Sequence, residues 1–165
     1  MRRKDREMPE EFAYMVAEKC EWAVFAMIDT EGMPYCVPIT IALDGKTVYF
    51  HSGPQGHKVD ALMNNNAVCI SCVGDTYRTP DKFTTEFESA IIRGKAIKVE
   101  SDEEKIHGLR LISQRHTPTN MHQFDEMIEM SLFRTDVWKV EIEEITGKRK
   151  KYDKDGKEMK FGRME

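Results

Sequence analysis

The sequence lacks a long apolar run, a strong excess of either charge and any abundance of cysteine. No apolar segment approaches the roughly 20 residues that cross a bilayer. The charged start, Met1–Glu7, also lacks the apolar stretch of a secretion signal. The formal net charge of −4 gives no general attraction to nucleic acid or to anionic membranes. We therefore expect a cytoplasmic protein whose partners include no nucleic acid and no membrane.

The length and composition indicate a single globular domain. A chain of 165 residues can bury a core without a disulfide or a metal. Hydrophobic residues make up 40% and charged residues 33%, which is the balance of a folded protein. We expect one domain over residues 1–147 and a basic tail over residues 148–165. Nucleic-acid contact by the tail is one interpretation, but only Tyr152 and Phe161 are available for base stacking, so a solvated extension is favoured.

The four cysteines are interpreted as reduced structural thiols. Cys69 and Cys72 form a C-x-x-C motif, which in other settings indicates a redox pair or half of a zinc site. Residues 67–73 read as a strand, however, and positions three apart in a strand face opposite sides. Cys20 and Cys36 provide no second C-x-x-C to complete a zinc site.

Turn signals and apolar patterns predict more strand than helix. Strands are expected at residues 21–28, 34–43, 46–51, 67–73, 83–100 and 137–145, with a hairpin turn at Asp44–Gly45 and a bulge at Gly94. Helices are expected after Pro9, at residues 57–64 and behind the capping box that begins at Ser101. Three strands follow one another before any long helix, so the pattern favours an antiparallel barrel or sandwich, α+β in class and mainly β.

The segment from Val48 to Lys58 carries the clearest chemical signal. A strand ends at His51, the small-residue loop Ser52–Gly56 follows, and the next helix has Lys58 in its first turn. A cation is unfavourable there because the helix dipole already makes the N-terminus positive. A bound anion would remove this conflict, and free N–H groups, Gly56 and Lys58 together would form a phosphate cradle. The alternative is a polar loop with a solvated lysine.

A second suggestive segment is Pro34–Thr40. Pro34 and Pro38 remove hydrogen-bond donors, so this strand is expected at a sheet edge or at a bulge. Its unpaired backbone groups would be available to a planar heterocycle. An irregular edge strand without any ligand explains the same residues.

Four motifs in one order resemble a known family. Residues 32–38 read Gly-x-Pro-Tyr-x-Val-Pro, residues 49–58 contain Tyr-Phe-His and Gly-His-Lys, residues 83–89 read Phe-Thr-Thr-x-Phe-x-Ser, and residues 140–148 match a closing strand. This series is similar to the pyridoxamine 5'-phosphate oxidase-related, FMN-binding split barrels, and within them to the 5-nitroimidazole-resistance proteins. The resemblance covers residues 20–148.

The resemblance implies a six-stranded antiparallel split barrel with peripheral helices, an FMN cofactor and a homodimer whose interface holds two flavins. It also assigns the cofactor-binding residues by position. Lys58 would bind the phosphate with help from Gly56, His57 and Ser89, while the backbone of Pro38, Ile39 and Thr40 would face the isoalloxazine ring. His51, followed by Ser52, matches the histidine close to the flavin and is the candidate catalytic residue.

The function implied is that of a flavoprotein that passes electrons from reduced FMN, supplied by a small-molecule donor, to a small acceptor such as a nitroimidazole. The sequence departs from the family at Glu88, where a cation is usual, and it lacks the Arg-rich, Trp-containing C-terminal segment of true pyridoxamine phosphate oxidases. Oxidation of vitamin B6 is therefore not expected. The alternatives are a flavin-sequestering protein without turnover, or a barrel that binds haem or a deazaflavin.

The histidines do not predict a metal site. His107, His116 and His122 lie on or between helices without a ligand spacing, so surface or capping roles are expected for them. His51 and His57 flank the loop, but no carboxylate follows nearby until Asp60.

Overall fold

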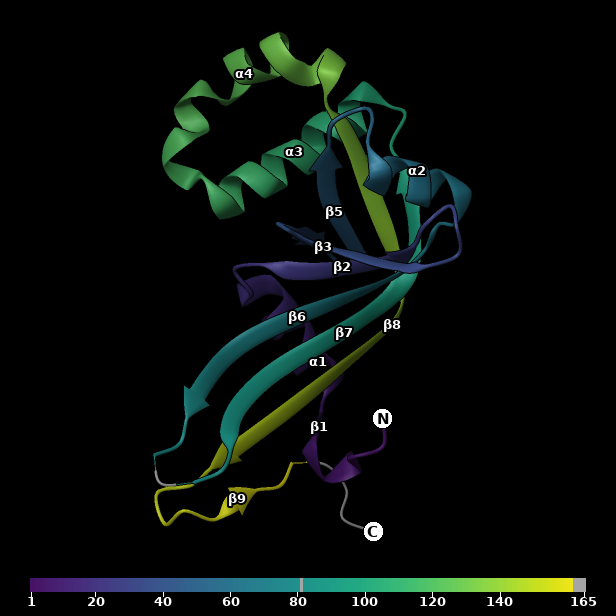
Figure 1. The fold of residues 1–165 in the computed structure, drawn as a ribbon. Helices are drawn as coiled ribbons and strands as arrows, with labels where there is room; N and C mark the ends of the chain where they lie inside the picture. The colour runs from purple at the N-terminus through teal and green to yellow at the C-terminus, as the bar shows by residue number, and fades with distance from the viewer. Residues whose placement is uncertain (81, 162–165) are drawn as a thin grey trace.

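The computed structural model describes residues 1–80 and 82–161 (Figure 1). Its strands are β1 (Glu7–Met8), β2 (Ala23–Ile28), β3 (Pro34–Ile39), β4 (Ala42–Asp44), β5 (Thr47–Ser52), β6 (Ala67–Arg78), β7 (Thr85–Lys98), β8 (Asp136–Tyr152) and β9 (Glu158–Met159). Its α-helices are α1 (Glu10–Lys19), α2 (His57–Asn64), α3 (Asp102–His116) and α4 (Phe124–Ser131). Short 3-10 turns lie at η1 (Lys4–Arg6), η2 (Pro118–Gln123) and η3 (Leu132–Arg134).

The strands form one curled antiparallel sheet, a half-barrel, in the order β3-β2-β6-β7-β8-β5-β4, and β1 and β9 pair with β8. The predicted antiparallel split barrel with peripheral helices is confirmed. The described residues form nine strands rather than six. The additional strands are β4, which the sequence pattern merged with β3, and the two-residue strands β1 and β9.

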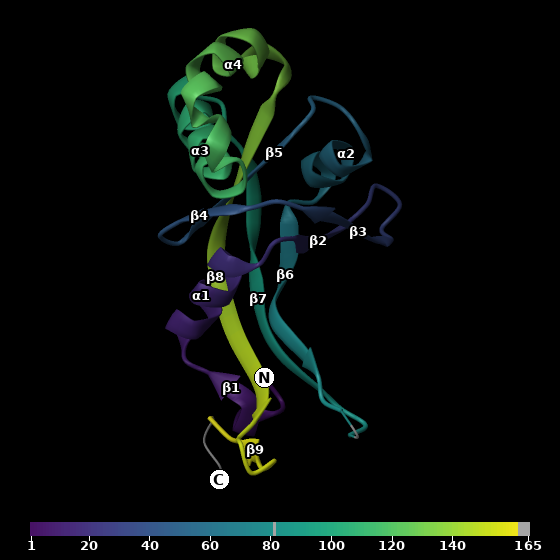
Figure 2. The ribbon, with the colours of Figure 1, turned by 90° about the vertical axis from the view of Figure 1, so that its left-hand side faces the viewer.

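Helices α2, α3 and α4 lie at one end of the molecule, and an arm of long strands extends to the other end. Helices α3 and α4 lie together at one end with α2 beside them, whereas β6, β7 and β8 continue away from them as a three-stranded arm (Figure 1). Figure 2 shows α1 beside this arm, and α1 packs against all three of its strands. No helix in the two described ranges combines the length and the hydrophobicity that a membrane span requires.

The expected strand 34–43 is interrupted at Thr40 and Ile41. The reason lies on α3, because the Ile41 carbonyl accepts hydrogen bonds from the Arg115 guanidinium and from His116 Nε2, each at 2.8 Å. Beyond this linker β4 pairs with β5 across a turn at Gly45, whose φ of +55° favours glycine. The predicted hairpin is therefore present, one residue later than expected.

Two bulges shape the arm. The pairing of β7 with β8 shifts register between Arg93 and Gly94, which confirms the bulge predicted at Gly94. A Cβ atom at Gly94 would overlap the Glu141 carbonyl, so the close approach of β8 requires glycine. A second shift, between Val73 and Thr76, lets β6 continue to Arg78 where the sequence pattern predicted an end at Val73.

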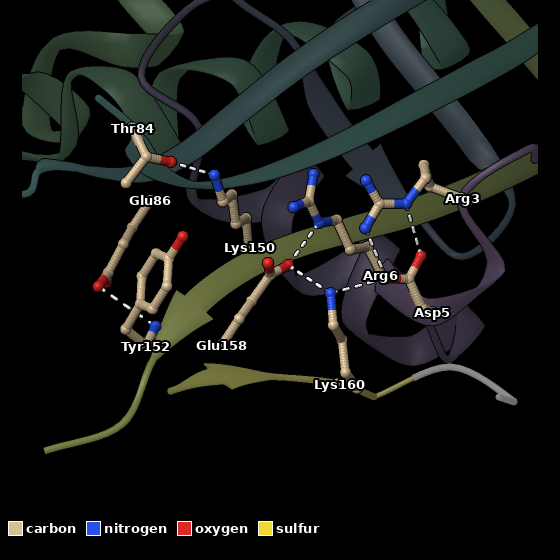
Figure 3. A network of polar contacts seen from close by, with 9 residues as sticks. All are labelled: Arg3, Asp5, Arg6, Thr84, Glu86, Lys150, Tyr152, Glu158 and Lys160. Carbon is tan, nitrogen blue, oxygen red and sulfur yellow. Dashed lines mark hydrogen bonds and ion pairs between the residues drawn. The ribbon is translucent and has the colours of Figure 1, made fainter. Parts of the chain in front are cut away.

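The predicted last strand, 137–145, is too short, and residues 148–161 of the predicted tail are not a solvated extension, while residues 162–165 lie outside the described residues. Strand β8 runs to Tyr152 because Lys150 and its neighbours pair with β7. The chain then turns back as β9, where Glu158 accepts from Arg6 at 2.6 Å and Lys160 contacts Asp5 at 2.7 Å (Figure 3). The hydrogen bond from Arg6 lowers the pKa of Glu158 to about 2. These ion pairs tie the C-terminal segment to the N-terminus.

The alternation of β5 sets the position of the candidate site. Phe50 lies on the barrel side, where its ring contacts Phe25 at a centroid distance of 4.7 Å and stacks on Trp138 at 6.3 Å. Tyr49 faces the other way, into a separate cluster beneath α3. His51 shares that face with Tyr49, since side chains two apart in a strand point the same way. The sequence of β5 therefore directs His51 towards the C-terminal end of α3.

Candidate functional site

A cavity of about 430 Å³ lies where β5, the β3–β4 linker and the end of α3 meet. His51 and Thr40, two of the residues predicted at the flavin, both line it. The remaining wall is formed by Glu21, Trp22, Ile112, Ser113, His116 and Thr117. A larger hollow of about 540 Å³ beside Asn64–Asn66 and Trp138 contains none of the predicted residues. The smaller cavity is thus the one in which the sequence prediction and the structure coincide in space.

His51 lines this cavity and remains exposed to solvent there. Partial desolvation by the surrounding residues is the main cause that lowers the pKa of the imidazole from its ordinary value of 6.5. The nearby charges of Lys58 and His116 lower the pKa further. In the protein without a ligand, these surroundings therefore favour the neutral imidazole of His51.

Lys58 lies next to His51, in the first turn of α2. Its side chain is half-buried, with Nζ 5.6 Å from the centroid of the Phe50 ring. Burial lowers the pKa of Lys58, and no carboxylate within residues 1–80 and 82–161 forms an ion pair with it. A half-buried cation without a counter-ion is costly, so this position is poised for an anion.

The start of α2 offers backbone donors to the same anion. Its N-cap is Gly56, which has a φ of +129° and provides no side-chain cap for the first helical N–H groups. A Cβ at Gly56 would meet no atom within 4 Å, so the space beside this backbone is open. Lys58, Gly56 and the free N–H groups together have the composition of a phosphate cradle.

Two predicted side chains are engaged elsewhere. The His57 ring packs edge-on against Tyr35 at 4.5 Å and lies 3.7 Å from Asp29, so only its backbone N–H faces the start of α2 freely. The Ser52 hydroxyl accepts from Trp138 Nε1 at 3.1 Å and donates to the Gly53 carbonyl at 2.8 Å. Ser52 therefore fixes the loop from within the core.

The segment Pro38–Thr40 ends an edge strand, as predicted from its prolines. Among the described residues, strand β3 is the last strand on its side of the sheet and pairs with β2 alone. Ile39 buries its side chain in the core, which leaves its backbone as the part available to a ligand. Thr40 then reaches the cavity wall.

Ser89 is not brought to the other predicted residues within one chain. It lies in the arm, opposite Val73 on β6 and Lys148 on β8. Its neighbour Glu88, which stands where the family has a cation, contacts Lys19 Nζ at 2.5 Å. Glu88 is thus neutralised inside the chain.

The sequence reasoning missed His116 and Trp22. His116 was expected at the surface or as a cap, but it lines the cavity and hydrogen-bonds the Ile41 carbonyl. His107 pairs with Asp44 and His122 with the Thr119 carbonyl, as surface or capping residues do. His116 carries no distinguishing pattern in sequence, since only the packing of α3 places it beside His51. Among the described residues, no group of three His, Cys, Asp or Glu side chains gathers as metal ligands would.

Solved structures with this architecture are numerous. A proposed 5-nitroimidazole antibiotic resistance protein from Bacteroides thetaiotaomicron is 29% identical, with a TM-score of 0.75 over 87% of this chain and 86% of that one. An FAD and haem binding protein from Mycobacterium smegmatis is 16% identical, with a TM-score of 0.76 over 96% and 83%. An FAD binding protein from the same organism is 18% identical, with a TM-score of 0.60 over 94% and 99%. At these low identities, the similarity to the last two proteins shows a shared fold alone.

Sequence comparison extends the likeness to the family level. No curated protein sequence matches the chain. The sequence model described as pyridoxamine 5'-phosphate oxidase matches residues 19–149. This range contains β2 to β8 almost completely, together with the cavity and Lys58. The chain therefore belongs to the pyridoxamine 5'-phosphate oxidase family, whose split barrel is a flavin-binding fold.

Proposed function

We propose that this protein binds FMN and passes electrons from the reduced flavin to a small acceptor such as a nitroimidazole. The observation that carries the proposal is Lys58, a half-buried cation at the open N-terminus of α2 for which the described residues supply no counter-ion. A phosphate monoester supplies two negative charges and several acceptors for the free N–H groups. FMN ends in such a group, whereas riboflavin does not.

The residues present suit both ends of FMN. Lys58 and the backbone at Gly56 and His57 would hold the phosphate, while the free edge of β3 at Pro38–Thr40 and the neighbouring cavity would receive the ring. When bound, FMN supplies the redox chemistry of the reaction. The protein's part is to orient the ring, to limit water and, at His51, to hold a proton or a hydrogen bond for the acceptor.

The acceptor class rests on two observations. The 29% identical Bacteroides thetaiotaomicron protein is described as a proposed nitroimidazole resistance protein. Near the C-terminal end of the described residues, Glu158 and Lys160 are bonded to Arg6 and Asp5 at the far end of the arm and do not line the cavity. Because true pyridoxamine phosphate oxidases hold their substrate with a C-terminal segment, this arrangement favours another small acceptor over pyridoxamine phosphate.

The absorption spectrum of the purified protein tests the cofactor. We expect visible flavin absorption, and we expect FMN as the only flavin released on denaturation when it is compared with FAD and riboflavin by chromatography. Release of FAD, a haem Soret band or failure to take up added FMN would contradict the proposal. Bound FMN without nitroimidazole reduction by the pre-reduced protein would leave flavin sequestration as the function.

We also propose that the chain works as a homodimer. Edge strand β3 has unpaired backbone groups, and Trp22, Val24 and Val73 on or beside β2 and β6 are exposed apolar side chains. Ser89 lies in the arm away from Lys58, so a flavin at Lys58 meets Ser89 only if a second copy provides it.

Sedimentation of the holoprotein at micromolar concentration tests the dimer. We expect a species of twice the 19.2 kDa chain mass, and FMN should dissociate as dilution separates the subunits. The variant Val24→Glu places a charge on the exposed face of β2 and should weaken both association and FMN binding. Glu143→Gln, an exposed substitution on β8, is the control. A monomer that retains stoichiometric FMN would exclude this arrangement.

A further inference from the structure

Two neighbouring side chains at the end of α3 use their hydrogen-bond donors inside the fold. His116 Nε2 lies 2.8 Å from the Ile41 carbonyl, which can only accept, so Nε2 carries the proton. The Thr117 hydroxyl donates to the Ser113 carbonyl at 3.2 Å. Both residues also line the cavity beside His51. A ligand in this cavity therefore meets two side chains whose donors are already engaged.

The free positions on these two side chains are hydrogen-bond acceptors. A neutral imidazole with its proton on Nε2 has an unprotonated Nδ1, which accepts a hydrogen bond. Among the described residues no donor reaches His116 Nδ1, and this atom is not one of the buried side-chain atoms without a partner, so solvent reaches it. Thr117 is also exposed, and its oxygen can still accept. The end of α3 thus offers two acceptors to a ligand in the cavity.

The linker between β3 and β4 does not depend on His116 alone. Arg115 Nη1 donates to the same Ile41 carbonyl at 2.8 Å, and its Nη2 donates to the carbonyls of Ala17 and Cys20 at 2.9 and 2.7 Å. If His116 were replaced, the Ile41 carbonyl would keep the arginine as its partner, so no buried acceptor would be left unpaired. The bond to Ile41 therefore fixes the tautomer of His116, while Arg115 anchors the linker.

The other wall residues suit a small, planar and uncharged ring. Trp22 and Ile112 supply apolar surface. The hydroxyls of Thr40 and Ser113 can donate hydrogen bonds, which the oxygens of a nitro group accept. Glu21 adds a carboxylate, which accepts hydrogen bonds and repels an anion. The cavity therefore combines donors for a nitro group with acceptors for an N–H group.

We propose that His116 and Thr117 select the molecule that receives electrons by accepting a hydrogen bond from its ring N–H group. This selection rests on the proposed function, under which the cavity holds that molecule. The substrate class is a neutral nitroheteroaromatic with an unsubstituted ring nitrogen, because an N-alkylated ring has no such donor. A ligand without the donor leaves both protein acceptors unpaired, and a site of this kind discriminates more strongly than an apolar pocket does by size.

The experiment compares two isomers that differ only in the position of one methyl group. 2-Methyl-4-nitro-1H-imidazole keeps the ring N–H, whereas 1-methyl-4-nitroimidazole replaces it, and both are neutral at pH 7. Isothermal titration of each isomer into the oxidised holoprotein measures binding without turnover, because no electron donor is present. We expect the N–H isomer to bind about fivefold to tenfold more tightly, which is the scale of one hydrogen bond.

Variants at the end of α3 identify the group that accepts from the ring N–H. His116→Phe keeps a planar ring and removes Nδ1, and Thr117→Val removes the hydroxyl with little change of shape. Each should weaken binding of the N–H isomer about threefold or more and leave the Kd of the N-methyl isomer nearly unchanged. His107→Phe replaces an exposed histidine on the same helix and is the matched control. Circular dichroism and flavin absorbance verify that each variant is folded and holds FMN.

Equal Kd values for the two isomers in the wild-type holoprotein would overturn the proposed selection. A preference that survives in the His116→Phe, Thr117→Val double variant would overturn it as well. Reduction of the isomers by chemically reduced holoprotein separates these results from the proposed function. If both isomers bind equally and are reduced, the function stands without the selection. If the N–H isomer is preferred but not reduced, the selection stands and electron transfer to nitroimidazoles is wrong. If neither isomer binds, both are wrong.

Discussion

Lys58→Met should strongly reduce FMN occupancy at concentrations that just saturate the wild-type protein. The half-buried ammonium lacks a carboxylate partner among the described residues, and a charge-assisted contact to phosphate typically contributes about 1.5–3 kcal/mol. When this contact is lost, the neighbouring N–H donors hold the phosphate without the lysine charge. The Kd for FMN should then rise by about tenfold to 150-fold. Isothermal titration of apoprotein with FMN measures this change.

Riboflavin provides the matched comparison for this variant. It should bind the wild-type protein weakly and the Lys58→Met variant about equally, since it has no phosphate to lose. Lys58→Arg should recover part of the FMN affinity, because the charge is kept with a different geometry. If FMN and riboflavin bind the wild-type protein with the same affinity, the phosphate cradle does not exist.

The stability of the apoprotein gives a second, independent readout. Because folding lowers the pKa of Lys58, the protonated lysine destabilises the folded state at neutral pH, and the effect fades as pH rises through the folded-state pKa. Without FMN, Lys58→Met should therefore melt at a higher temperature than the wild-type protein at pH 7. If Lys58 had only a structural role, Lys58→Met would instead lower the melting temperature of the apoprotein.

His51→Ala should leave FMN occupancy nearly unchanged and slow nitroimidazole reduction roughly 10²-fold, the usual scale for loss of a general acid. The side chain lines the cavity at the end of β5 and is not part of the phosphate cradle. Stopped-flow mixing of chemically pre-reduced protein with the acceptor measures the rate per bound flavin. His107→Ala, which removes an imidazole paired with Asp44 at the surface, is the control.

The pH dependence of this rate further tests the assignment of His51 as the residue that supplies a proton. In the absence of ligand, His51 has a pKa below 6.5, partly because of the charge of Lys58. A bound phosphate would offset that charge and raise the pKa of His51. The wild-type rate should then rise as pH falls through the pKa of His51, and the His51→Ala rate should lose this dependence. A lowered flavin affinity with an intact rate per bound flavin would instead make His51 a cofactor ligand.

Local chemistry was enough to predict much of the fold. Gly94 marked its bulge, Gly45 its hairpin, and the helix expected at residues 57–64 was found at His57–Asn64. The fold predictions were wrong at positions where residues far away in the sequence determine the local structure. The Ile41 carbonyl is taken by Arg115 and His116, which are 74 and 75 positions away, and no local pattern shows this break. Likewise the strand predicted to end at Val73 continues to Arg78, because it stays paired with β7.

The residues of the candidate site differ in the same way: some can be recognised from the local sequence, and others only from the tertiary structure. Lys58 and Gly56 could be noticed from sequence because a cation after a glycine conflicts with the dipole of the helix they begin. His51 was noticed through the family resemblance, and the alternation of β5 explains its direction. The placement of His116 and Trp22, which complete the wall, arises only from tertiary packing. Neither helix nor strand periodicity contains that information.

The position of β8 in the chain affects how the protein is made. Strand β8 pairs with β7, β5 and β1, so it is the common neighbour of strands from both ends of the sequence. Translation reaches it late, at Asp136–Tyr152, and until then β5 and β7 expose unpaired edges. His51 pairs with Val137, so the end of β5 is fixed only when this late strand docks. A nascent chain of this protein therefore carries an open sheet through most of its synthesis, a state prone to association with other chains.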